Sequence, residues 1–308
     1  MGNTSFLLRV VGQRLLRQDT NCPYCGHSQS TVIGRKRIVL QLRRCADCAL
    51  MYRWPKDTPR FNRRFYQRQY RQGMTTDMPD AEHLEKLKTS IFQGTEKHLS
   101  DKIAVLKALM PRGRVLDYGC SWGYGTFQLV AAGYDAVGFE ISEPRAEFAR
   151  SRLDAAVIST EGALDELAGS FDGVFASHVL EHLSAPSVAF DCLASLLKPN
   201  GLLLAFVPNC GGNEARRLGV NWGPMCCEKH PLAIHAEFLE GALPRHGFKC
   251  IFFSNPYDLD AIAGNLSINH PGITSQCLCG DELLVVARKI EPAAQCKSIS
   301  REASPRLT

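Results

Sequence analysis

The chain has 308 residues, of which 45% are hydrophobic, and it carries a net charge of +5 at neutral pH. This size and composition fit one α/β domain with a small appendage, and they require no disulfide staples. The chain contains no run of about 18 uninterrupted apolar residues, which excludes a transmembrane helix. The 13 cysteines, an odd number, and a start unlike an export signal favour a reducing, cytoplasmic location over a disulfide framework.

The positive charge is concentrated towards the N-terminus. Residues 1–71 contain 15 lysines and arginines against 3 acidic residues, whereas residues 72–308 contain 21 against 28. A basic module beside an acidic one suggests an anionic partner, such as a nucleic acid, a phosphorylated small molecule or a membrane surface. The alternative is that the arginines only solvate a small module with a weak core.

The first fifty residues combine a helical pattern with paired cysteines. Residues 1–18 place apolar side chains on one side of a short basic helix. Two C-x2-C pairs follow, and they are formed by Cys22, Cys25, Cys45 and Cys48. Four thiolates in two such knuckles suit a tetrahedral zinc ion with no open position, so the sequence predicts a structural zinc ribbon. The alternating residues 37–42 are expected to form a strand of it.

Residues 51–112 are predicted to be a helical linker or cap. Their first part interleaves aromatic with basic side chains: Tyr52, Trp54, Phe61, Phe65, Tyr66 and Tyr70 with Arg53, Arg60, Arg63, Arg64, Arg68 and Arg71. Such residues can stack on RNA bases and contact phosphates. They fit equally well a helix whose aromatic side packs on the main domain.

Residues 113–290 alternate strand and helix patterns. The expected strands are residues 114–118, 136–141, 156–159, 171–176, 202–207, 248–254 and 282–288. Helices are expected from Tyr124 to Gly133, after Ser142, over 184–197 and over 235–246. This order predicts a doubly wound, mostly parallel seven-stranded sheet that binds ligands at the carboxyl ends of its strands. The polar residues 291–308 are expected to be a disordered tail.

A glycine-rich loop, residues 117–125, joins the first of these strands to its helix. Glycines let the backbone pass close to a ligand, and Glu140 at the end of the second strand offers a carboxylate for ribose hydroxyls. The loop lacks the full G-x-G-x-x-G spacing, because Ser121 stands at its second glycine. Asp117 would repel a pyrophosphate but suits an ammonium group, so the loop favours S-adenosylmethionine (SAM) over NAD.

The loop and Glu140, together with residues 171–183 and 196–209, resemble class I SAM-dependent methyltransferases, especially the branch with an N-terminal zinc ribbon. The resemblance covers about residues 113–290, and the ribbon adds residues 20–50. It implies a Rossmann-like fold in which SAM is held by Asp117, Gly119, Cys120, Ser121, Gly123 and Glu140. Within this set, Glu140 would hold the ribose and Asp117 the methionine end. Ser121 departs from the family, which usually has glycine there, but serine is small enough to be tolerated.

The candidate catalytic residues follow the fourth strand. His178 is the preferred general base, because histidine titrates near neutral pH. His182 is the second candidate, although the Leu180–Leu183 stretch is common across the family, so a structural hydrogen bond explains His182 equally well. The resemblance also places a later segment over the acceptor pocket, although it fits a surface loop too; its notable residues are Trp222, Cys226, Cys227, His230 and His235.

The acceptor class follows partly from motifs that are missing. After the fourth strand the chain has neither the Asn/Asp-Pro-Pro-aromatic turn of amine N-methylation nor the cysteine of cytosine C5-methylation. We therefore expect methyl transfer to an anionic small molecule, sugar or glycan. The alternative is an RNA methyltransferase, acting on rRNA or tRNA, that binds RNA through the basic N-terminal region. The expected domains are residues 1–50, 51–112, 113–290 and the tail.

Overall fold

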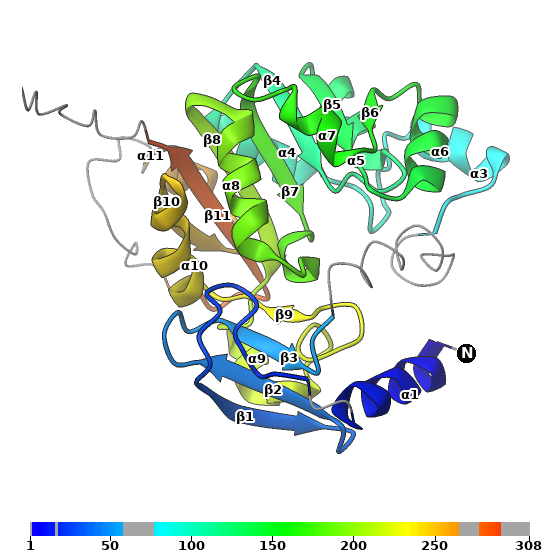
Figure 1. Cartoon of the computed structure of the whole chain (residues 1–308). Coiled ribbons are helices and arrows are strands. Elements are labelled where there is room, and N and C mark those ends of the chain that lie inside the picture. The colour runs from blue at the N-terminus through cyan, green and yellow to red at the C-terminus, as the bar shows by residue number, and fades with distance from the viewer. Residues whose placement is uncertain (1, 16–17, 58–76, 265–276, 291–308) are drawn as a thin grey trace, which may run out of the picture.

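Two β-sheets organise the protein in the computed structural model, which describes residues 2–15, 18–57, 77–264 and 277–290 (Figure 1). The smaller sheet has the strand order β1-β2-β3-β9, and the larger has the order β10-β11-β8-β7-β4-β5-β6. In the larger sheet only β11 runs against its neighbours. The predicted mostly parallel seven-stranded sheet is confirmed. No described helix is long and apolar enough to cross a membrane.

All seven expected strands of the large sheet are present. They are β4 (Arg114–Tyr118), β5 (Asp135–Phe139), β6 (Val157–Ile158), β7 (Phe171–Ser177), β8 (Leu197–Pro208), β10 (Phe248–Ser254) and β11 (Glu282–Lys289). The strand order reverses at β4, with β5 and β6 on one side and β7 and β8 on the other. Such a reversal opens a crevice at the carboxyl ends of the central strands, where ligands bind in open α/β sheets.

The helices expected within 113–290 begin and end close to their predicted positions, whereas the short helices at 161–165, 213–218 and 259–264 were not predicted. The described helices are α1 (Gly2–Leu15), α3 (Ala81–Thr89), α4 (Ser100–Leu109), α5 (Tyr124–Ala131), α6 (Glu143–Leu153), α7 (Glu161–Asp165), α8 (Pro186–Leu196), α9 (Asn213–Leu218), α10 (Ala236–Ala242) and α11 (Leu259–Gly264). Short 3-10 turns are η1 (Leu180–His182), η2 (Gly219–Asn221) and η3 (Leu243–His246). Ser142 takes the N-cap position of α6 but makes no side-chain cap bond, and its backbone N–H donates to Glu140 instead.

Helices cover both faces of the large sheet. Alternate residues of β4, β7 and β8 point to opposite faces, as the two-residue period of a strand requires. On one face Leu116 and Leu203 are fully buried in a core with α8 and α10. On the other face Val115 and Leu204 are buried with α4, α5 and α11. This double cover explains the continuous apolar run, residues 202–207, in β8.

The zinc-ribbon region departs from the sequence-based expectation in two places. Its strands are β1 (Ser30–Lys36), β2 (Leu40–Cys45), β3 (Met51–Trp54) and β9 (Leu232–Ala233). The strand expected over 37–42 is wrong at its start, because Arg37 and Ile38 form a hairpin turn at φ 50° and 61°. Residues 51–54 were expected to be helical but pair with β2, because the turn after the second cysteine pair returns the chain along that strand.

The ribbon lies at the end of the large sheet where β7 and β8 finish (Figure 1). Its sheet is completed by a distant segment of the chain, because Met51 and Tyr52 of β3 pair with β9, which follows β8. The Tyr24 ring also packs edge-on against Phe238 of α10 at 5.2 Å. The ribbon is therefore fixed to the main domain at the ligand-binding edge of the sheet.

Candidate active site

The glycine loop folds directly across the end of β5. Tyr118 pairs with Phe139 in the parallel register of β4 and β5. The next two residues, Gly119 and Cys120, both donate their backbone N–H to the Phe139 carbonyl, at 2.8 and 3.0 Å. Glu140 therefore follows immediately beside the loop. The two parts of the predicted cofactor site, the glycine loop and Glu140, are therefore brought together by the parallel register of β4 and β5.

The loop runs through three residues in the left-handed backbone region, Gly119 (φ 80°), Ser121 (φ 53°) and Gly123 (φ 86°). A Cβ at Gly119 would lie 2.6 Å from Val179, and one at Gly123 would lie 2.6 Å from Ala149. Close packing therefore requires both glycines, in addition to their backbone angles. Ser121 takes a conformation that costs a residue with a side chain about 1–2 kcal/mol, and its hydroxyl accepts a 2.8 Å hydrogen bond from Arg145.

Two buried carboxylates stand at the ends of β4 and β5. Asp117 and Glu140 are 4% and 6% exposed. Burial raises the pKa of Asp117 to about 7, although Thr126 opposes this shift through a 2.8 Å hydrogen bond to the carboxylate. Burial also raises the pKa of Glu140, against hydrogen bonding from Ser142. An ammonium group and ribose hydroxyls need such acceptors, so this set of side chains fits SAM.

Cys120, which was predicted to contact the cofactor, has its side chain buried against β5. Its side chain is buried, and its sulfur lies where a Cβ on Gly138 would approach it to 2.6 Å. Sequence reasoning passed over Gly138, although this close approach requires a glycine there. A contact between Cys120 and a cofactor stays a prediction.

His178 lies between two carboxylates immediately after β7. Its Nε2 is 2.6 Å from Glu282, and its Nδ1 is 3.3 Å from Glu181. Lys102 and Tyr257 also bond to Glu282, at the start of β11. Burial disfavours the protonated imidazole, but the two carboxylates outweigh it and raise the pKa of His178 to about 9. The sequence analysis identified His178 but not Glu282, nor the two residues that bond to Glu282, Lys102 and Tyr257.

A second group of side chains adjoins His178. The potential ligand atoms of Glu181, His182 and His230 all lie within 4.8 Å of one another. The imidazole rings of His182 and His230 are 4.7 Å apart and nearly perpendicular. Burial lowers the pKa of His182 to about 4, so the ring is neutral at pH 7. Its Nδ1 contacts the Lys229 carbonyl at 2.7 Å, which fits the structural interpretation; its catalytic role stays a prediction.

The ribbon holds the segment that carries His230. Arg53 of β3 is 1% exposed, and it donates to the carbonyls of Cys227 and Glu228 at 2.9 and 3.0 Å. Its guanidinium also pairs with Asp57. Of the residues noted in this segment, Trp222 and Cys226 pack in a cluster with α1 and β2. His230 is thus brought to the site by contacts that begin in the ribbon.

The four predicted zinc ligands are brought together as their spacing indicates. Their sulfur atoms lie within 4.8 Å of one another, with Cys22 3.5 Å from Cys48 and Cys25 3.5 Å from Cys45. A tetrahedron of thiolates around zinc has edges of about 3.8 Å, given bonds of about 2.3 Å. The arrangement therefore fits the metal that the sequence predicts. His27 does not belong to this group of ligand atoms.

The described part of the aromatic and basic stretch is buried. Tyr52, Arg53 and Trp54 are 0%, 1% and 9% exposed. These three side chains pack inside the ribbon and offer no surface to RNA. The other aromatic and basic residues of the stretch, from 60 to 71, lie outside the described residues, as does the predicted tail at 291–308.

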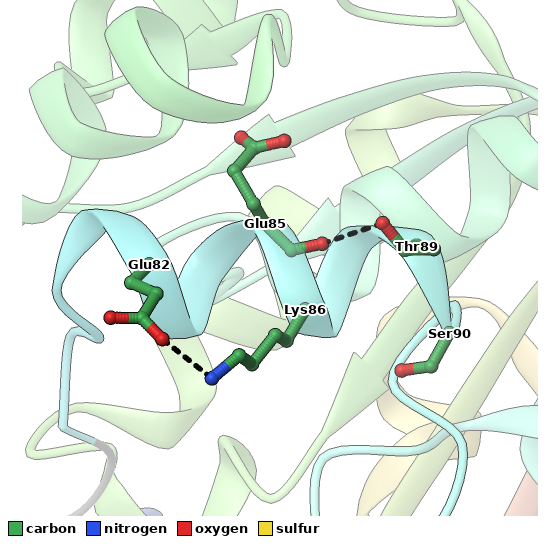
Figure 2. A pocket seen from close by; sticks show the side chains of 5 residues that line it. All are labelled: Glu82, Glu85, Lys86, Thr89 and Ser90. Atoms are coloured by element: carbon green, nitrogen blue, oxygen red, sulfur yellow. Dashed lines mark hydrogen bonds and ion pairs between the residues drawn. The ribbon is translucent and has the colours of Figure 1, made fainter.

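A surface pocket on α3 lies apart from all of these residues (Figure 2). It is lined by Glu82, Glu85, Lys86, Thr89 and Ser90. Their interactions stay within the helix, as in the 2.7 Å pair of Glu82 and Lys86. Exposed pairs of this kind contribute little, and no predicted site residue lines the pocket, so we assign it no function.

Comparison with known proteins finds methyltransferases. A family model described as a methyltransferase domain matches residues 92–251. The chain is 35% identical over 103 residues to the ubiquinone biosynthesis O-methyltransferase of Xanthomonas axonopodis pv. citri, covering 31% of this chain and 43% of that protein. For the Bordetella avium protein of the same name, the identity is 30% over 167 residues, with 52% and 64% covered. The chain thus spans less than two thirds of these relatives.

The chain was also compared with solved structures. A SAM-dependent methyltransferase from Archaeoglobus fulgidus is 21% identical to this chain, with a TM-score of 0.46. The match covers 68% of this chain and 100% of that protein.

Proposed function

This chain belongs to the methyltransferase-domain family, and from that premise we propose that it transfers a methyl group from SAM to a hydroxyl group of a small molecule. The observation that carries the proposal is the pair of buried carboxylates, Asp117 and Glu140, beside a glycine loop that bonds to the end of β5. The relatives named O-methyltransferases of ubiquinone biosynthesis support oxygen as the accepting atom and a small molecule as its carrier.

The chain's own residues would hold SAM at both ends. Glu140 would accept hydrogen bonds from the ribose, and Asp117 would hold the methionine ammonium. When bound, SAM supplies a sulfonium methyl group: the S–CH3 bond breaks, an O–CH3 bond forms, and S-adenosylhomocysteine leaves. The hydroxyl proton must go to a base, because the ether product does not retain it.

His178 is the group that we assign to take this proton. The turn that carries it rests on the glycine loop, since a Cβ at Gly119 would lie 2.6 Å from Val179. The imidazole remains half exposed, whereas Glu181 is buried. The raised pKa means that the neutral fraction, which accepts the proton, is the smaller one at neutral pH.

We further propose an anionic small molecule or glycan as the acceptor. The support is the basic charge of residues 1–71, which contain 15 lysines and arginines and 3 acidic residues. Part of this charge is used inside the protein, because both Arg9 and Arg53 pair with Asp57. An acceptor with one or two anionic groups needs few free cations, whereas RNA would engage many.

Substitution Glu140→Gln is expected to weaken SAM binding by about 10- to 100-fold, because a charge-assisted hydrogen bond to the ribose is lost. Isothermal titration calorimetry with SAM measures this directly. The matched control is Glu143→Gln, three residues later, whose carboxylate is exposed and pairs with Arg150. Unchanged affinity in the Glu140 variant would contradict the site assignment.

The acceptor class is tested by transfer of a labelled methyl group from SAM into fractionated extract of the source cell. The label is expected in a small-molecule or glycan fraction and is expected to resist nuclease. Label that disappears from the large fraction after RNase treatment would overturn the small-molecule proposal and favour the RNA alternative.

A further inference from the structure

Glu181 is a buried carboxylate without hydrogen bonds. The residue is 1% exposed, and neither side-chain oxygen has a hydrogen-bond partner in the described part of the chain. Its nearest charged neighbour is Nδ1 of His178, at 3.3 Å from Oε1. A buried carboxylate that accepts no hydrogen bond is costly unless a cation compensates it. His178 supplies one positive charge beside Oε1, but both carboxylate oxygens still lack a hydrogen-bond partner among the described residues, so the site has room for a second ligand.

Two imidazoles lie close to this carboxylate, and each has its Nδ1 at a backbone carbonyl. Nδ1 of His182 lies 2.7 Å from the Lys229 carbonyl, and Nδ1 of His230 lies 2.9 Å from the Pro224 carbonyl. A ring nitrogen at that distance donates its proton to the carbonyl, so Nε2 is the nitrogen that carries the lone pair. Nε2 of His182 lies 3.9 Å from Oε1 of Glu181. Backbone carbonyls orient metal-bound histidines in this way.

We propose that Glu181, His182 and His230 bind a divalent transition-metal ion, with zinc the best match. Two imidazoles and one carboxylate form the ligand set of zinc sites that keep an open position. The three ligand atoms already lie within 4.8 Å of one another. Around an ion with bonds of about 2.0–2.1 Å, they would be about 3.3 Å apart, so only a small approach is needed. This site is separate from the four cysteines of the ribbon.

The ion would have a place in the reaction, and this part of the inference rests on the proposed function. An open coordination position beside His178 would take the acceptor oxygen and favour loss of its proton. A cation there would also attract an anionic acceptor. Because Arg53 holds the carbonyls of Cys227 and Glu228, the ribbon sets the position of the third ligand, His230.

The test is metal binding by the full chain, scored without SAM or acceptor. Protein is dialysed against micromolar Co²⁺, and the bound metal is counted by mass spectrometry. The wild type is expected to bind two ions, one with the thiolate-to-cobalt absorption of the cysteine site and one without it. Glu181→Gln and His230→Ala are each expected to retain only the thiolate-bound ion.

The control is His235→Ala, which removes a buried histidine of the same segment that contacts the Ala49 carbonyl of the ribbon. It is expected to bind two ions. The retained thiolate absorption shows in each variant that the ribbon is folded. A wild type that binds only the ribbon ion, or variants that keep both, would overturn the site. A chain that binds two ions but transfers no methyl group would instead contradict the proposed function.

Discussion

Replacement of His178 by alanine is expected to lower methyl-transfer turnover by about 10²- to 10⁴-fold, the contribution of a positioned general base. SAM affinity is expected to stay close to that of the wild type, because Asp117 and Glu140 lie on other strands. Turnover is measured with saturating SAM and the acceptor identified from the extract, and SAM affinity by calorimetry. The two readouts separate a catalytic defect from loss of the cofactor site.

A glutamine at the same position separates proton transfer from positioning. Glutamine can bond to Glu282 but cannot take a proton at neutral pH. If His178 is the base, His178→Gln is as impaired as the alanine variant. His83→Ala, an exposed histidine on α3, is the control that should keep full turnover. Full turnover in the glutamine variant would show that His178 only positions its neighbours.

The placement of Glu140 beside the glycine loop could be predicted from the sequence because it depends on local patterns. The strands β4 and β5 are read from their apolar residues, and parallel pairing then places Glu140 beside the glycine loop. The left-handed residues of the loop are glycines at two of three positions. The third, Ser121, shows no such signal, because its conformation is stabilised by packing and by Arg145.

The acceptor side is less predictable because its residues come from distant segments. Glu282 reaches His178 from β11 across 104 positions of sequence, and Lys102 reaches Glu282 across 180. No periodicity or motif links such residues. His230 was noted in the sequence, but its place beside Glu181 depends on the pairing of β3 with β9. That pairing joins a segment that was expected to be helical to one that fits a surface loop.

Loss of the ribbon zinc is expected to unfold the ribbon and to abolish turnover while SAM still binds. Metal binding supplies the folding free energy of small zinc modules, on the order of 10 kcal/mol. Cys22 and Cys45 are each 3% exposed within the main apolar cluster, so an empty site would leave thiols without their ligand inside that core. Cys25→Ser removes one ligand without touching Glu181.

The defect should spread from the ribbon to the acceptor segment through Arg53, whose guanidinium bonds to the carbonyls of Cys227 and Glu228. In Cys25→Ser, hydrogen exchange is therefore expected to accelerate over residues 22–54 and 226–235, while β4 and β5 keep their protection. Cys192→Ser, on α8 and outside the zinc cluster, is the control. If the Cys25 variant loses its zinc but keeps full protection of residues 226–235 and full turnover, the ribbon does not position the acceptor segment. The pairing of β3 with β9 would then have a role other than positioning that segment.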